Sequence, residues 1–142
     1  MKPKILFPFK LVTVLAIAIL INACTVTTTK PIKAEFNKDI PTLESEIKKI
    51  VICDNFDVNG SEINSNNKIA KSLEIKVVNG VNIPKNNDEL KTLAHSIGSY
   101  IKSSLKDSTE FNTYKVVFIT KGGNDVVSTT KTVVQEFKSE EL

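Results

Sequence analysis

Residues 86–105 read NNDELKTLAHSIGSYIKSSL and have the clearest helical periodicity in the chain. Its apolar residues recur every three or four positions: Leu90, Leu93, Ala94, Ile97, Ile101 and Leu105. At about 100° per residue they form one stripe roughly 120° wide, which is typical of a helix lying on a sheet. Asn86, followed three residues later by Glu89, offers a start similar to a capping box. The sequence therefore predicts an amphipathic helix here.

Strand-like segments lie on both sides of this helix. Before it, residues 71–79 alternate, with Leu73, Ile75 and Val77 on one face. After it, residues 113–120 are rich in β-branched and aromatic residues, and residues 126–137 are rich in Thr and Val. The glycine-containing turn signal at 121–125 predicts that these two strands form a hairpin.

A fourth strand is predicted near the start of the domain. The β-branched run at 50–53 favours a buried strand from about Lys49, after a short helical or irregular lead-in. Residues 57–67 are rich in Asn, Ser and Gly and predict a long loop. The order ββαββ predicts an α+β fold, with an antiparallel four-stranded sheet and one helix packed on one face. The second face of such a sheet is open to water or to a partner.

The first 24 residues carry the most specific signal in the chain. Lysines at 2, 4 and 10 precede an apolar run at 11–21 that is too short for a permanent transmembrane helix. The run ends in Ile21-Asn22-Ala23-Cys24, which resembles the lipobox of bacterial lipoproteins. The resemblance implies that the leader is cleaved before Cys24 and that Cys24 is the lipid attachment residue. An ordinary secretory leader or an uncleaved anchor, with Cys24 incidental, is the alternative.

These features divide the chain into a signal peptide (1–23), a lipidated N-terminus with a flexible tether (24–41) and a single α+β domain (42–142). Residues 25–41 show no helical or strand period, and as a flexible coil they would span roughly 23 Å. Position 25 is Thr, and no acidic run follows Cys24. The retention and surface-export signals of similar lipoproteins are therefore missing, which predicts the periplasmic face of an outer membrane. The protein is therefore predicted to bind the membrane through the lipid on Cys24.

The charge of the chain argues against one class of partner. The chain has 19 basic residues, all of them lysine, and 16 acidic residues. Three of these lysines precede Cys24 and no acidic residue does, so the charges of the mature chain balance. Recognition of phosphates and guanine edges relies on the arginine fork. No nucleic-acid partner is expected.

His95 is the only histidine, so any histidine-dependent chemistry must use it. Ser99 lies one helical turn away and Asp88 lies nearby, so a catalytic triad can be drawn. The helical projection places His95 about 140° from the apolar stripe, on a face without a pocket or an oxyanion hole. A solvated polar face is the preferred interpretation, and a small hydrolase using His95 is an alternative function.

Two patterns resemble ligand loops. Asn55-x-Asp57-x-Asn59-Gly60 is similar to the opening of a calcium loop, but Asn66 stands where a bidentate glutamate is needed, so calcium is not expected. Gly122-Gly123 lies in a hairpin and lacks the helix N-terminus that binds phosphate. The sequence therefore predicts no metal, no cofactor and no catalytic residues.

Two features concern covalent modification. Cys53 is left over after lipidation of Cys24, and the apolar run before it favours burial as a small hydrophobe; pairing between chains is the alternative. Asp107-Ser108-Thr109 resembles a three-residue motif at which some Bacteroidota O-glycosylate exported proteins. A loop at a helix end uses the same residues for its turn, which is the simpler interpretation.

The expected function is that of a membrane-anchored envelope lipoprotein with a non-enzymatic domain, whose partner is an envelope protein or a cell-wall component. An inhibitor or immunity lipoprotein directed against a hydrolase is an alternative, with the acidic loop at 54–67 (Asp54, Asp57 and Glu62) as its plug. In composition and layout, residues 68–121 resemble small uncharacterised Bacteroidota lipoproteins. That resemblance implies no activity and assigns no functional residue.

Overall fold

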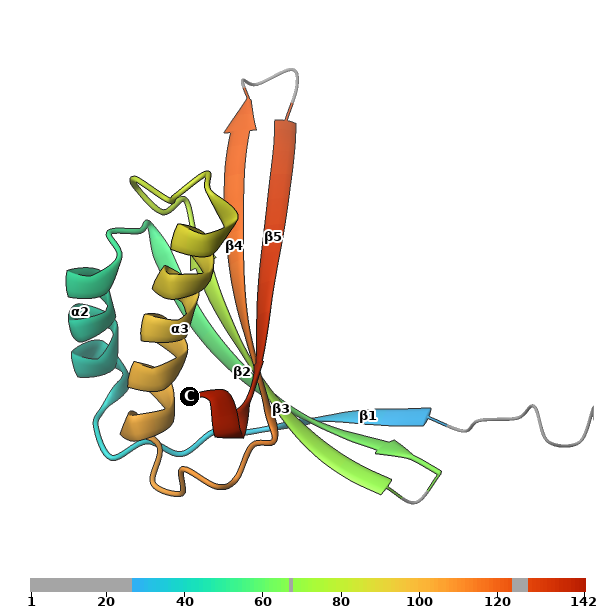
Figure 1. Ribbon diagram of the computed structural model, residues 1–142. Coiled ribbons are helices and arrows are strands. Elements are labelled where there is room, and N and C mark those ends of the chain that lie inside the picture. Colours follow the sequence, from blue (N-terminus) through green and yellow to red (C-terminus); the bar gives the residue numbers. More distant parts are fainter. Residues whose placement is uncertain (1–26, 67, 124–127) are drawn as a thin grey trace, which may run out of the picture.

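Two helices lie on one face of a twisted five-stranded sheet in the computed structural model, which describes residues 27–66, 68–123 and 128–142 (Figure 1). The elements in chain order are β1 (Thr27–Ile32), α2 (Ile40–Ile50), β2 (Asn55–Ser65), β3 (Lys68–Val78), α3 (Asn87–Ser104), β4 (Thr113–Gly123), β5 (Ser128–Lys138) and η1 (Ser139–Glu141). The predicted α+β class is confirmed.

The sheet itself differs from the prediction. Its strand order is β1-β2-β3-β4-β5, and β3 and β4 run parallel while the other neighbours are antiparallel. The prediction of four antiparallel strands was therefore wrong in strand number and in one orientation. The physical reason is α3, which carries the chain back along the sheet so that β4 starts beside Ser72 of β3. A helical crossover of this kind joins parallel strands.

The first part of the domain was also assigned wrongly. Residues 40–50 form α2, whose Leu43 and Ile47 are fully buried, and the predicted strand from Lys49 does not exist. The predicted loop at 57–67 is instead mostly β2. Along β2, Phe56 and Val58 are half-buried and alternate with exposed polar residues. The strand period was present, but Asn and Ser on its open face made it look like a loop.

Part of the predicted tether belongs to the fold. Residues 27–32 form β1, which pairs antiparallel with β2 from Thr27 opposite Ser65 to Ile32 opposite Gly60. Phe36 then forms a bridge with Leu105. β1 forms because β2 would otherwise present an unpaired edge of backbone donors and acceptors.

The predicted central helix is confirmed as α3. Asn86 caps it, with its side-chain oxygen accepting a hydrogen bond from the backbone N–H of Asp88 at 2.9 Å. The stripe residues Leu90, Ala94, Ile97, Ile101 and Leu105 are buried. They belong to one core with Leu73, Ile75 and Val77 of β3 and Tyr114, Val116 and Phe118 of β4. The predicted strand at 71–79 and the predicted hairpin after the helix are confirmed as well.

Two parts of the sheet extend beyond the helices (Figure 1). β3 and β4 pair only over Ser72–Val78 and Thr113–Ile119, so the remaining strand ends diverge with the twist. One extension is the β4–β5 hairpin. The other, which we call the arm, comprises residues 27–31 of β1, 62–65 of β2 and 68–71 of β3. In the part of the chain that the structure describes, neither helix has the length and apolarity needed to cross a membrane.

Candidate functional site

An exposed apolar patch lies at the end of the sheet where β2 begins and β3 ends. Ile52 and Val81 belong to two different loops, and their side chains are 65% and 53% exposed. The backbone N–H of Val81 donates a hydrogen bond to the carbonyl oxygen of Ile52 at 2.7 Å, which joins the two loops. Both aliphatic side chains are thus presented together to the solvent.

A hollow of about 330 Å³ lies beside this pair and is formed by the end of α2, the two loops and α3. We call its exposed and half-buried apolar residues the loop patch: Ile50, Ile52, Val81, Pro84 and Leu93. Val51 also lines the hollow but is buried. Lys49 also lines the hollow and provides a positive charge there. An exposed apolar patch rimmed by polar residues is a surface that can contact another protein.

Asn79 fastens this end of the molecule. Its backbone N–H donates to the carbonyl oxygen of Ile119 at 2.8 Å, and its side-chain oxygen accepts from the N–H of Lys121 at 2.8 Å. Its side-chain nitrogen donates to Asp54 at 2.7 Å. Its φ of 51° is a left-handed conformation that asparagine tolerates better than most residues. The loop patch is therefore held in shape by β4 and by the loop after α2.

Cys53 directly follows Ile52 and is buried, with 8% of its surface exposed, as predicted. Burial is the main cause that raises the pKa of its thiol. A thiol that stays protonated is a poor nucleophile. Cys53 therefore packs as a small apolar residue and offers no reactive group to the hollow.

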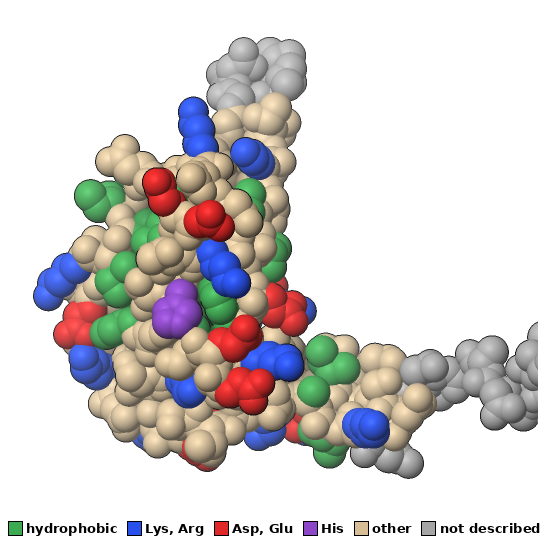
Figure 2. All heavy atoms as spheres, viewed as in Figure 1, with side chains coloured by type: hydrophobic (Ala, Val, Ile, Leu, Met, Phe, Trp, Pro, Cys, Tyr) green, Lys and Arg blue, Asp and Glu red, His purple; other side chains and the backbone are tan. Residues whose placement is uncertain are grey.

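Ser99, His95 and Asp88 do not form the hydrogen-bonded chain of a catalytic triad. His95 Nδ1 is 3.4 Å from Ser99 Oγ, while His95 Nε2 is 2.7 Å from the carbonyl oxygen of Glu141. Among the described residues, Asp88 makes no hydrogen bond to His95. The ring also packs edge-on against Phe137, with the ring centroids 5.7 Å apart. His95, visible at the surface in Figure 2, thereby fastens the C-terminal turn to α3.

One expectation about the surroundings of His95 was wrong. A shallow hollow of about 450 Å³ lies beside it, between α3 and β5. Its lining residues are Asp88, Lys91, Thr92, His95, Ser96 and Phe137. Phe137 provides the apolar wall that the projection of an isolated helix could not reveal.

The residues of the calcium-like pattern lie in β2 instead of a loop. Asn55, Asp57 and Asn59 occupy its exposed face, and Asn59 donates a hydrogen bond to Asp57 at 2.6 Å. An extended strand does not wrap its ligands around an ion. Over residues 27–66, 68–123 and 128–142, no group of three potential metal-ligating side chains occurs. The acidic plug loop of the inhibitor hypothesis is likewise absent, because Asp57 and Glu62 belong to β2.

The remaining sequence features lie apart from the loop patch. Asp107 accepts hydrogen bonds from the N–H and the hydroxyl of Thr109, at 2.8 and 2.6 Å, and these bonds lower the pKa of Asp107. These bonds fit the turn that was the simpler interpretation of this motif, and glycosylation of the exposed Ser108 stays an untested alternative. Gly122 and Gly123 end β4. Cys24 lies outside the described residues, so its lipidation also stays a prediction.

Sequence reasoning missed the loop patch. A lone valine between Gly80 and Asn82 was the available signal, because a turn rarely needs an aliphatic residue. Its pairing with Ile52 depends on two loops that are far apart in the chain. No family model, curated protein or solved structure matches this chain.

Proposed function

We propose that this protein is a lipid-anchored envelope protein whose domain binds a partner protein through the loop patch and catalyses no reaction. The observation that carries the proposal is the exposed pair of Ile52 and Val81 beside a hollow of about 330 Å³. Burial of apolar surface contributes roughly 25 cal/mol per Å², so covering two branched aliphatic side chains favours association.

The anchor in this proposal rests on the lipobox at 21–24. Acylation of Cys24 would hold the protein on the periplasmic face of the outer membrane, since two or three acyl chains bind a bilayer lastingly. The partner is therefore an envelope protein, or a cell-wall component with a protein part.

The chemistry of the loop patch defines the partner's contact. An aliphatic side chain of the partner fills the hollow, and a carboxylate beside it meets Lys49. The neighbouring Lys48 already pairs with Glu44 at 2.7 Å, whereas no ion pair of Lys49 is seen among the described residues. Charge complementarity of this kind sets the orientation of a complex more than its strength.

A test is photo-crosslinking in cells from a photoreactive residue placed at position 81 of the full chain, followed by mass spectrometry. We expect one dominant envelope protein. Ile52→Asp should reduce its capture by at least about tenfold, because loss of a central interface contact costs on the order of 1–4 kcal/mol.

The matched control is Ile40→Asp. Ile40 is 57% exposed, similar to Ile52, but lies at the start of α2, at the opposite end of that helix from Lys49 and Ile50. Capture from position 81 should be unchanged in this variant. Equal losses in both variants, or unchanged capture in Ile52→Asp, would contradict binding through the loop patch.

A further inference from the structure

In the sequence, the first described residue of the fold is only three positions after the proposed lipid anchor. β1 begins at Thr27, so only residues 25 and 26 separate it from Cys24. All six residues of β1 pair with β2. The linker between the proposed anchor and the sheet is therefore two residues long, whereas a tether of 17 residues was expected.

The chain after β1 is also fastened to the body of the domain. The N–H of Asn37 donates to the carbonyl oxygen of Ser104, and the N–H of Lys106 donates to the carbonyl oxygen of Glu35, both at 2.9 Å. The side chain of Asn37 donates to the carbonyl oxygen of Leu105 at 3.0 Å. β1 thus cannot leave the sheet without breaking its pairing with β2, and the segment that follows it is held to the end of α3.

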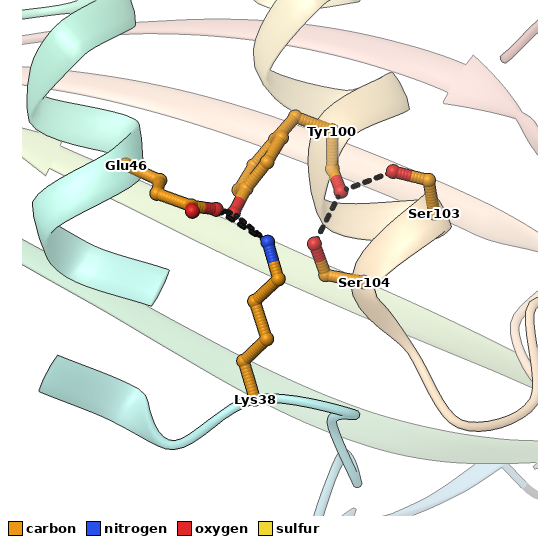
Figure 3. A network of polar contacts seen from close by, with 5 residues as sticks. All are labelled: Lys38, Glu46, Tyr100, Ser103 and Ser104. Carbon is orange, nitrogen blue, oxygen red and sulfur yellow. Dashed lines mark hydrogen bonds and ion pairs between the residues drawn. The ribbon is translucent and has the colours of Figure 1, made fainter. Parts of the chain in front are cut away.

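A polar network secures the next segment (Figure 3). Lys38 donates to Glu46 of α2 at 2.6 Å, and the hydroxyl of Tyr100 on α3 donates to the same carboxylate. The hydroxyls of Ser103 and Ser104 both donate to the carbonyl oxygen of Tyr100 at 2.8 Å. Both helices therefore hold the connection between β1 and α2 in place.

The short linker between Cys24 and Thr27 limits how far the arm can be from the membrane. Three steps of about 3.8 Å join the Cα atoms of residues 24 and 27, so these atoms are at most about 11 Å apart. The headgroup layer of one leaflet is roughly 5–8 Å thick. An acylated Cys24 lies at the inner boundary of that layer, which brings Thr27 within or directly above it. Ser65 pairs with Thr27, and Lys68 pairs with Ser65, so both residues are brought to the same layer.

The tip of the arm has the side chains that this layer accommodates. Ile69 is 62% exposed and Lys68 is exposed. The only carboxylate among the described arm residues, Glu62, pairs with Lys30 at 3.3 Å. A lysine reaches lipid phosphates while an isoleucine contacts the upper acyl carbons. No uncompensated negative charge of the described arm opposes such a contact.

We infer that the tip of the arm, formed by Thr27, Ser65, Lys68 and Ile69, rests in the headgroup layer of the bilayer that holds Cys24. The arm acts as a foot that sets the orientation of the domain. The loop patch lies at the opposite end of β2, whose 11 residues span about 35 Å. It therefore faces away from the membrane, where a partner in the envelope reaches it. This inference rests on the proposed lipidation of Cys24.

The chain contains no tryptophan, so a single introduced tryptophan reports its own position. We would prepare the lipidated full chain as Ile69→Trp and as Ile52→Trp, because both positions are exposed and tolerate a large side chain. Each protein is reconstituted in vesicles of phosphatidylethanolamine and phosphatidylglycerol that carry nitroxide-labelled headgroups. We expect fluorescence quenching to be several-fold stronger at position 69 than at position 52.

A flexible Gly-Ser spacer inserted between residues 26 and 27 is the matched control, and it should abolish most of the quenching at position 69. Acylated protein that binds vesicles but shows no quenching at position 69 overturns the foot while leaving the anchor intact. Equal quenching at both positions also overturns it, since the domain would then lie flat. Protein that mass spectrometry shows to be unacylated overturns the proposed anchor, and the foot with it.

Discussion

Glu46 is the residue at which three separate segments of the chain meet (Figure 3). The hydrogen bond from Lys38, and after it the bond from Tyr100, hold the pKa of Glu46 below its usual value of 4.5. A carboxyl group whose pKa is lowered by folding stabilises the native state above its unfolded pKa. That contribution is lost as the pH falls from about 4.5 through the lowered pKa.

We therefore expect Glu46→Gln to lower the melting temperature at neutral pH and to have little effect at about pH 3. Thermal unfolding of both proteins by circular dichroism across this range is the measurement. Glu44→Gln is the matched control, because Glu44 forms its ion pair with Lys48 of the same helix and its loss should change the melting temperature less. A deficit for Glu46→Gln that stays constant with pH would contradict the ionic role of this residue.

Among the elements, β1 and a core aromatic ring both approach Gly60 of β2 closely. A Cβ atom at this position would lie 2.7 Å from the carbonyl oxygen of Ile32 and 3.1 Å from a ring carbon of Phe111. The strand needs glycine here because the backbone of β1 and a core aromatic ring both approach it closely. This contact fixes the end of β1 against β2.

Gly60→Ala should therefore lower the free energy of unfolding by about 1–3 kcal/mol, because β1 or Phe111 must shift. Urea denaturation measures the change. Gly122→Ala in β4 is the control, since a Cβ atom there approaches only the hydroxyl of Thr129, at 3.5 Å. Its expected change is close to zero. Equal stability of the two variants would mean that β1 does not pack on β2 as described.

At the scale of the whole molecule, one buried cluster joins both helices to β3, β4 and β5. Ile97 of α3 is fully buried within it, whereas Ile40 at the start of α2 is 57% exposed. Because the helices and the sheet share this core, the domain should unfold in one cooperative transition.

Ile97→Ala should lower the free energy of unfolding by about 2–5 kcal/mol, through lost burial and the cavity that remains. The same shift should be seen by far-ultraviolet circular dichroism and by tyrosine fluorescence, since Tyr100 reports on the helices and Tyr114 on the sheet. Ile40→Ala serves as the control with almost no effect. Two separate transitions would show that the helices and the sheet do not share one core.

A helix or strand could be predicted where its buried apolar residues recur at a regular spacing that is clear from the sequence. α3 shows its stripe because each turn places an aliphatic residue against the sheet, and β3 shows clean alternation because one of its faces is buried. β2 was missed because its open face carries Asn, Asp and Ser, which are also the residues of loops. The loop patch was missed because Ile52 and Val81 come together only through a long-range backbone hydrogen bond.

The α+β class, the central helix and the C-terminal hairpin could be predicted from the sequence, because each depends on neighbouring residues. Lipid attachment at Cys24 stays a prediction. Only the tertiary structure decided the parallel pairing of β3 with β4, the addition of β1 to the edge of β2, and the place of the loop patch. These features depend on where α3 returns the chain and on which strand edge is left unpaired. Local periodicity carries no information about either, since both arise from contacts between residues far apart in the chain.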